Sequence, residues 1–172
     1  MRFKMLSVGL LMLALATPVA ARGQISDADL GERVADAIQR YSLFDIFDDV
    51  NISVDNRAVR LTGRVTLPIK RDEIGKRVAK VDGIRSLVND IQVLPLSRFD
   101  DDLRLRVARA IYNHPAFWQY ATMAQPPIHI VVENGHITLT GRVGSQVEKS
   151  LAFAVAHVSG SFDVKNELKA DR

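Results

Sequence analysis

The histidines and acidic residues of this 172-residue chain are the side chains that could perform acid–base or metal chemistry. The sequence has four histidines and no cysteine, which excludes a thiolate nucleophile, a disulfide and a cysteine-ligated metal. His129 and His136 are expected on the outward face of one hairpin, roughly 13 Å apart at ~3.3 Å per residue. A single zinc ion cannot bridge that distance. We therefore expect no metal site and no cofactor.

The sequence also lacks the patterns that activate a nucleophile for hydrolysis. It contains neither the G-x-S-x-G pattern of a nucleophile elbow nor the H-E-x-x-H pattern of a metalloprotease. The acidic run at residues 100–102 lies at the start of an expected helix, where the helix dipole accounts for negative charge. We interpret this run as capping and do not expect the protein to be an enzyme.

A five-residue sequence, LTGRV, occurs twice and shows how the chain is organised. It fills residues 61–65 and returns at residues 139–143. The flanking residues recur in the same order, so that Asp29-Leu30 returns as Asp102-Leu103. The chain therefore consists of two copies of one unit of about 70 residues.

The first copy changes from a helical period to a period of two. Apolar residues between Leu30 and Tyr41 share one helical face, and alternating residues from Val50 to Gly63 predict a β-hairpin. A second helix is expected to begin near Pro68 and to end at Gly83. A last strand over residues 86–93 completes the unit.

The second copy repeats this order with small changes. Its hairpin turns at Asn134-Gly135, a pair that favours a type I′ turn. Its second helix is expected to face inward through Val147, Leu151, Val155 and Val158. We predict an α+β fold of two tandem α-β-β-α-β domains, each a three-stranded mixed sheet with two helices on one face. The expected boundaries are residues 22–96 and 97–172.

Two glycines and two asparagines stand at equivalent places in the copies. Gly63 and Gly141 belong to no phosphate-binding loop, and we interpret them as positions where a strand and a helix pack closely. Asn89 and Asn166 lie among apolar residues of the last strands. We expect their side chains to satisfy nearby backbone groups rather than to bind a ligand.

Residues 1–21 are typical of a secretory signal peptide. Arg2 and Lys4 precede an apolar run of about 12 residues, and Val19 and Ala21 suit a signal peptidase. A membrane span needs ~20 apolar residues, so we expect none in the mature chain. A bacterial lipoprotein needs a lipidated cysteine, which the sequence lacks. We expect cleavage after Ala21 and a periplasmic location.

The charge balance bears on the class of partner. The formal net charge is +3, and two of the positive charges lie in the predicted signal peptide. The remaining charge is close to zero, which argues against a nucleic-acid-binding protein that depends on a broad positive field. An anionic partner would have to be bound by a local patch.

The pattern NGHITLTGRV at residues 134–143, followed by Gly160 and by Asn166-Glu167-Leu168, resembles the BON domain, named for bacterial OsmY and nodulation proteins. The resemblance covers nearly the whole mature chain, twice, and the order of signal peptide and two domains is similar to periplasmic OsmY-type proteins. It implies a non-enzymatic protein that binds phospholipid surfaces or envelope proteins under osmotic or envelope stress. The first copy departs from the family pattern at Asn56-Arg57 and at Leu67-Pro68.

Comparison of the two copies identifies candidate binding residues. On one outward helical face and in the following loop, polar residues of the first copy give way to apolar, basic and aromatic residues in the second. The first copy has Glu32, Asp36, Gln39 and Asp45 at the positions that change. The candidate set in the second copy is Leu105, Arg109, Tyr112, Trp118 and, in a longer loop, Tyr120.

These candidate residues fit three roles. Aromatic and arginine side chains suit a membrane interface, they suit a protein interface, or they pack against the first unit. Our leading expectation is an anionic phospholipid surface, bound chiefly by the second unit. The alternative is a chaperone or adaptor that binds envelope proteins. The pattern specifies neither the relative pose of the units nor an oligomeric state.

Overall fold

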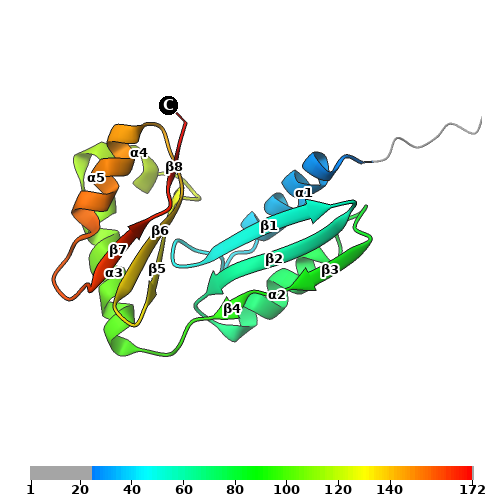
Figure 1. Cartoon of the computed structure of the whole chain (residues 1–172), viewed down its shortest axis with the longest axis horizontal. Coiled ribbons are helices and arrows are strands. Elements are labelled where there is room, and N and C mark those ends of the chain that lie inside the picture. The colour runs from blue at the N-terminus through cyan, green and yellow to red at the C-terminus, as the bar shows by residue number, and fades with distance from the viewer. Residues whose placement is uncertain (1–24, 172) are drawn as a thin grey trace, which may run out of the picture.

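The computed structural model describes residues 25–171, which form two domains of one design in tandem (Figure 1). The first domain contains α1 (Asp27–Gln39), β1 (Asp49–Asp55), β2 (Ala58–Val65), α2 (Pro68–Val78), β3 (Ser86–Asn89) and β4 (Gln92–Val93). The second domain contains α3 (Arg98–Tyr112), the 3-10 turn η1 (Pro115–Phe117), α4 (Trp118–Ala121), β5 (Ile128–Glu133), β6 (His136–Val143), α5 (Gln146–Ala156), β7 (Asp163–Asn166) and β8 (Lys169–Ala170). The predicted α+β fold of two α-β-β-α-β units is confirmed. The predicted signal peptide lies outside the described residues.

Each sheet is mixed, with an antiparallel hairpin and a parallel last strand. The hairpin registers pair Asp55 with Ala58 and Glu133 with His136 around two-residue turns. The last strand was expected to be continuous over residues 86–93. It is instead divided into β3 and β4, which both pair with β2, and β7 and β8 pair with β6 in the same way. Asn89 and Asn166 stand at the two breaks.

These two asparagines have the structural role that the sequence predicted. The side-chain amide of Asn166 donates to the carbonyl of Lys149 on α5 (2.8 Å). Its oxygen accepts from the backbone N–H of Leu168 (3.2 Å). Asn89 makes the equivalent bonds to Arg71 and Ile91 in the first domain. Each asparagine therefore ties the interrupted strand to the second helix.

Both helices of each domain cover one face of its sheet, as predicted. The predicted inward faces of α1 and α3 are buried, including Leu30 and Val34 in one and Leu103 and Val107 in the other. Serines cap α1, α3 and α5 by accepting a backbone N–H three residues on. Within residues 25–171, none of the helices is both long enough and apolar enough to cross a bilayer.

The inward face predicted for α5 is wrong at its first residue. Val147 was expected to be in the core, but 76% of its surface is exposed. The helix buries Ala152 and Ala156 instead, while Leu151 and Val155 are only partly buried. Because alanine is small, this face lets α5 approach the sheet closely and turns the larger apolar side chains toward the rim and the solvent.

The acidic run at residues 100–102 also needs correction. Ser97 caps α3, whereas the carboxylate of Asp100 is buried and accepts from the backbone N–H groups of Asn134 (2.9 Å) and Gly135 (2.8 Å). Asp100 therefore holds the turn of the hairpin rather than the end of its own helix. In the first domain Asp27 holds residues 56 and 57 in the same way (2.7 and 2.9 Å).

The junction between the second strand and the second helix is bridged by different groups in the two domains. In the first, the buried carboxylate of Asp48 accepts from the Thr66 N–H (2.9 Å) and pairs with the buried ammonium of Lys70 (2.7 Å). In the second, the N–H of Gly144 donates to Tyr120 Oη (3.0 Å) and to Glu148 Oε2 (2.8 Å). Buried polar groups at both junctions are thus hydrogen-bonded.

The two domains meet on the face of the second sheet that carries no helices. Ile46, in the loop between α1 and β1, accepts a hydrogen bond from the backbone N–H of Ile130 on β5 (2.7 Å). Side chains add the contacts Thr140 Oγ1 to Asp49 Oδ1 (2.8 Å), Arg64 Nε to Glu133 Oε2 (2.9 Å) and His129 Nδ1 to the carbonyl of Asp48 (2.6 Å). Val131 and Thr140 are consequently buried although they point away from their own core.

The repeated glycines are required by the backbone, although for a different reason than expected. Gly63 and Gly141 have φ of +115° and +104°, a conformation that residues with a side chain rarely adopt. A Cβ on Gly141 would collide with the carbonyl oxygen of Pro127, which leads into the neighbouring strand. The tight contact is therefore between the two strands of the hairpin and not between strand and helix.

We expect Gly141→Val to lower the free energy of unfolding of the second domain by at least about 2 kcal/mol, because it adds backbone strain and a steric collision. Chemical denaturation measures this loss. Gly144→Ala is the control, since the nearest contact of its Cβ beyond its chain neighbours would be the Glu148 carboxylate at 3.4 Å. Its effect should stay within ~0.5 kcal/mol. Equal stability of the two variants would contradict the role assigned to Gly141.

Candidate functional site

Three of the five candidate residues lie on the surface of the second domain. Leu105, on α3, is 45% exposed, and Trp118, at the start of α4, is 72% exposed. Arg109, one turn after Leu105 on α3, is also exposed, and no ion pair engages it within residues 25–171. An apolar, a cationic and an aromatic side chain are therefore all available to a partner.

The two tyrosines of the candidate set are bound inside the domain. Tyr112 is half-buried, and its hydroxyl donates to the carbonyl of Ile128 (2.5 Å). Tyr120 is buried and donates to Glu148 Oε2 (2.6 Å). Burial raises the pKa of both phenols above the usual range, and the bond to Glu148 raises that of Tyr120 further. The predicted exposure of Tyr112 is therefore wrong, and Tyr120, which the sequence placed in the candidate set as part of the longer loop, is buried as well.

The candidate surface is turned away from the first domain. The first domain contacts the helix-free face of the second sheet, whereas α3 and α5 cover the opposite face (Figure 1). Because Leu105 and Trp118 stay exposed in the presence of the first domain, packing between the domains does not account for them. Of the three roles that the sequence left open, packing between the domains is the one that these exposures do not fit.

Helix α5 adds exposed apolar residues that the sequence analysis had not placed on the surface. Val147 is 76% exposed and Phe153 is 39% exposed. Met123, which follows α4, is also exposed. We call this set the apolar helix layer, and its members are Leu105, Trp118, Met123, Val147 and Phe153.

A comparison of the second helices shows a loss of charge on α5, although its layer residues Val147 and Phe153 align with the uncharged Ile69 and Gly75. The caps Leu67 and Ser145 set the register between α2 and α5, which are both 11 residues long. Four charged residues of α2 then align with uncharged residues of α5. The charged set is Asp72, Glu73, Lys76 and Arg77, and its counterparts are Ser150, Leu151, Ala154 and Val155. Helix α5 therefore carries two charged residues where α2 carries six.

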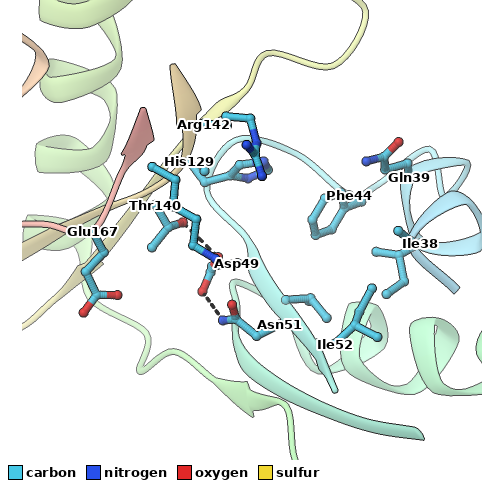
Figure 2. Close-up of a pocket in the computed structure, with 14 residues that line it drawn as sticks. Ile38, Gln39, Phe44, Asp49, Asn51, Ile52, His129, Thr140, Arg142 and Glu167 are labelled. Carbon is cyan, nitrogen blue, oxygen red and sulfur yellow. Dashed lines mark hydrogen bonds between the residues drawn. The ribbon is translucent and has the colours of Figure 1, made fainter. Parts of the chain in front are cut away.

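A cleft of about 360 Å³ lies between the domains (Figure 2). Its first wall is apolar and includes Ile38, Phe44 and Ile52 of the first domain. Its other wall carries polar residues of the second domain, namely His129, Thr140, Arg142, Glu167 and Lys169. Figure 2 shows Asp49 between the walls, bonded to Thr140 and to Asn51.

The histidines of the second hairpin have separate partners. His129 contacts the carbonyl of Asp48 in the other domain, and its ring packs 5.6 Å from that of Phe44. His136 contacts the carboxylate of Asp163. Across the described part of the chain, no three histidine, aspartate or glutamate side chains converge in a way that could hold a metal ion.

The sequence pattern of the BON domain matches residues 26–95 and again residues 100–172. Among solved structures, the chain is similar to CdsD, a structural protein of the type III secretion system of Chlamydia trachomatis. The first such structure has 14% identity, a TM-score of 0.29, and coverage of 81% of this chain and 91% of that one. A structure of the CdsD C-terminal domain has 12% identity, a TM-score of 0.30, and coverage of 86% and 100%. Comparison with curated proteins gives no match.

We expect Tyr112→Phe to lower the free energy of unfolding by about 1–2 kcal/mol, because the carbonyl of Ile128 would lose its partner. The raised pKa of Tyr112 means that the unfolded chain ionises first, at a pH of about 10. Stability should therefore fall as the pH rises above about 10, and the variant should show a shallower fall. Denaturation at several pH values measures both effects. An unchanged free energy at neutral pH and an unchanged alkaline slope would contradict this structural role.

Proposed function

The chain belongs to the BON domain family and carries two BON domains, and on this premise we propose that it is a non-enzymatic binding protein of the cell envelope. Its second domain binds the surface of anionic phospholipid membranes. The single observation that supports this proposal is the apolar helix layer, in which Leu105 and Trp118 are exposed, together with the exposed Arg109, which lies one turn after Leu105 and is in no ion pair within residues 25–171.

The composition of this layer fits the boundary between lipid headgroups and acyl chains. Tryptophan is enriched at that depth because its ring is amphipathic. Leucine, valine and phenylalanine side chains remove apolar surface from water when they enter the acyl region. A basic side chain near an anionic surface contributes about 1 kcal/mol. With few charges of its own, the layer would bind a membrane reversibly, through several weak contributions together.

The orientation of the two domains also supports the proposal. Because the first domain lies on the other face of the second sheet, it would not separate the apolar helix layer from a flat membrane. The first domain would instead project toward the solvent (Figure 1). A protein placed in this way can hold a second partner above the lipid surface.

We place the protein in the periplasm, with a role under osmotic or envelope stress. The signal-peptide character of residues 1–21 and the family resemblance support this location. The alternative function is that of a chaperone or adaptor that binds envelope proteins. Its affinity for a client protein would increase with the exposed apolar segments of that client and would not depend on the charge of lipid headgroups.

We expect Trp118→Asp and Arg109→Glu each to weaken binding to anionic liposomes in a flotation assay. The arginine change should cost about 5-fold or more in affinity, and it should act only on anionic vesicles, because its effect is electrostatic. Leu43→Asp and Arg33→Glu introduce the same acidic residues at exposed apolar and basic positions of the first domain and should leave binding intact. Both test variants should melt as the parent does, since neither side chain is in the core.

The outcomes of this assay separate the two functions. Normal folding with undiminished flotation of both variants would eliminate the apolar helix layer as the lipid site. Association that is the same for neutral and anionic vesicles, or that appears only with unfolded client proteins, would favour the chaperone or adaptor.

The location has a test of its own. We expect the exported protein to begin at Arg22, because cleavage after Ala21 suits a signal peptidase. Mass spectrometry of the intact periplasmic protein measures this. Retention of residues 1–21 in that fraction would contradict the proposed processing.

A further inference from the structure

The two domains differ at the outer edge of the first hairpin strand. In an antiparallel pair, every second residue points its N–H and C=O groups away from the partner strand. The register from the turn shows that these residues are Ile128, Ile130 and Val132 on β5. The equivalent residues on β1 are Val50, Ile52 and Val54. Each set forms the edge to which another strand could be added.

The edge of β5 is closed by three contacts. From α3, Tyr112 donates to the carbonyl of Ile128 (2.5 Å) and the buried Arg104 donates to that of Val132 (2.8 Å). Between them, the N–H of Ile130 donates to the carbonyl of Ile46 from the first domain (2.7 Å). This last bond shows that the edge of this hairpin accepts a passing polypeptide segment.

The edge of β1 has none of these contacts. Where α3 carries Arg104 and Tyr112, α1 carries Gly31 and Gln39. Within residues 25–171, no hydrogen bond reaches the outward backbone groups of Val50, Ile52 or Val54. Exposed edges are usually blocked in natural proteins, because they pair with other chains. The second domain is blocked in this way and the first is not.

The open edge is also the floor of a groove. Beside it, α1 presents the small residues Ala28 and Gly31, which with Ile52 and Val54 line a depression of about 350 Å³. The cleft of Figure 2 begins where this depression ends, and Ile52 lines both. Small residues on the helix leave space for a strand, and the cleft and the depression together are lined by residues 49–52 and 54 of β1.

The charge around this groove indicates the chemistry of its occupant. Asp27 and Asp49 line it, Glu32 and Asp36 lie on α1 in a neighbouring depression that shares Ala35 with the cleft, and Asp55 ends β1. Two arginines of α1, Arg33 and Arg40, offset them in part, and Arg40 is paired with Asp36. At the interdomain end, Arg142 and Lys169 face the groove together with Glu167. The end beside the hairpin turn carries the carboxylates of Asp27 and Asp55 together with the cation of Arg57, and this net negative charge favours a basic residue.

We propose that the outer edge of β1 binds an extended segment of a partner protein by strand addition. The backbone of the segment pairs with Ile52 and its neighbours, as in other cases of β-augmentation. Apolar side chains at alternate positions of the segment enter the groove beside Gly31, and a lysine or arginine lies near Asp27 and Asp55. This site is on the first domain and does not depend on lipid binding by the second.

The second domain supplies the blocking variant. Gly31→Arg combined with Gln39→Tyr gives the first domain the two side chains that close the edge of β5. Gly31→Ala is the matched control, because its Cβ would meet only Val54 Cγ2 at 3.8 Å, which is an ordinary contact. Thermal unfolding of the exported protein verifies that all variants are folded.

The probe is a synthetic peptide of alternating valine and threonine with a lysine at each end. Its binding is measured by NMR of the exported protein and by fluorescence anisotropy of the peptide. We expect the amide signals of Ile52 and Val54 to shift, at least a 10-fold loss of affinity in the Arg/Tyr variant, and no loss in Gly31→Ala. Glutamate in place of the lysines should weaken binding, and N-methylation of the peptide backbone should abolish it.

Three results would overturn the proposal. These are the absence of peptide binding, equal binding by the Arg/Tyr variant, and shifts confined to the second domain. A concentration-dependent dimer that the Arg/Tyr variant abolishes would assign the edge to a second copy of this chain instead of a partner.

Discussion

A carboxylate at the start of the first helix holds the hairpin turn in both domains. Asp27 and Asp100 each accept two consecutive backbone N–H groups from the turn. This contact fixes the distance and the angle between the helix and the hairpin edge. It therefore decides which helix residues stand over that edge, Gly31 in the first domain and Arg104 in the second. Whether the edge is open or closed follows from two helix side chains, Arg104 and Tyr112, and from the loop of the other domain, on a frame that is otherwise the same.

The periodic parts of the chain were the parts that the sequence could predict. The inward faces of α1 and α3, the hairpin registers and the roles of Asn89 and Asn166 all depend on local spacing, and the structure confirms them. Because the LTGRV sequence recurs with its flanks, the tandem arrangement could be predicted too. Those features depend on neighbours a few residues apart, which a sequence displays directly.

The features that the sequence did not predict depend on long-range contacts. Val147 belongs to an apolar series, yet small alanines set the rotation of α5 against the sheet. Tyr112 and Tyr120 resemble exposed aromatic residues until their hydroxyl partners on Ile128 and Glu148 are known. Of the candidate surface, Leu105, Arg109 and Trp118 could be placed correctly, because comparison of the copies removes the shared core from consideration. The same comparison applied to α2 and α5 finds the loss of charge on α5 but not Val147 or Phe153, whose counterparts are Ile69 and Gly75.

The contact of Ile46 with β5 has a consequence for the order in which the protein is completed. Ile46 and Phe47 pack on the core of the second domain, while Phe44, only two residues earlier, packs on the core of the first. The first domain is synthesised first, and domains generally fold as units in that order. At that stage Ile46 and Phe47, at the tip of the loop between α1 and β1, have no core to pack against. The loop can reach its final conformation only after β5 has formed, so the last part of the first domain to mature waits for the folding of the second.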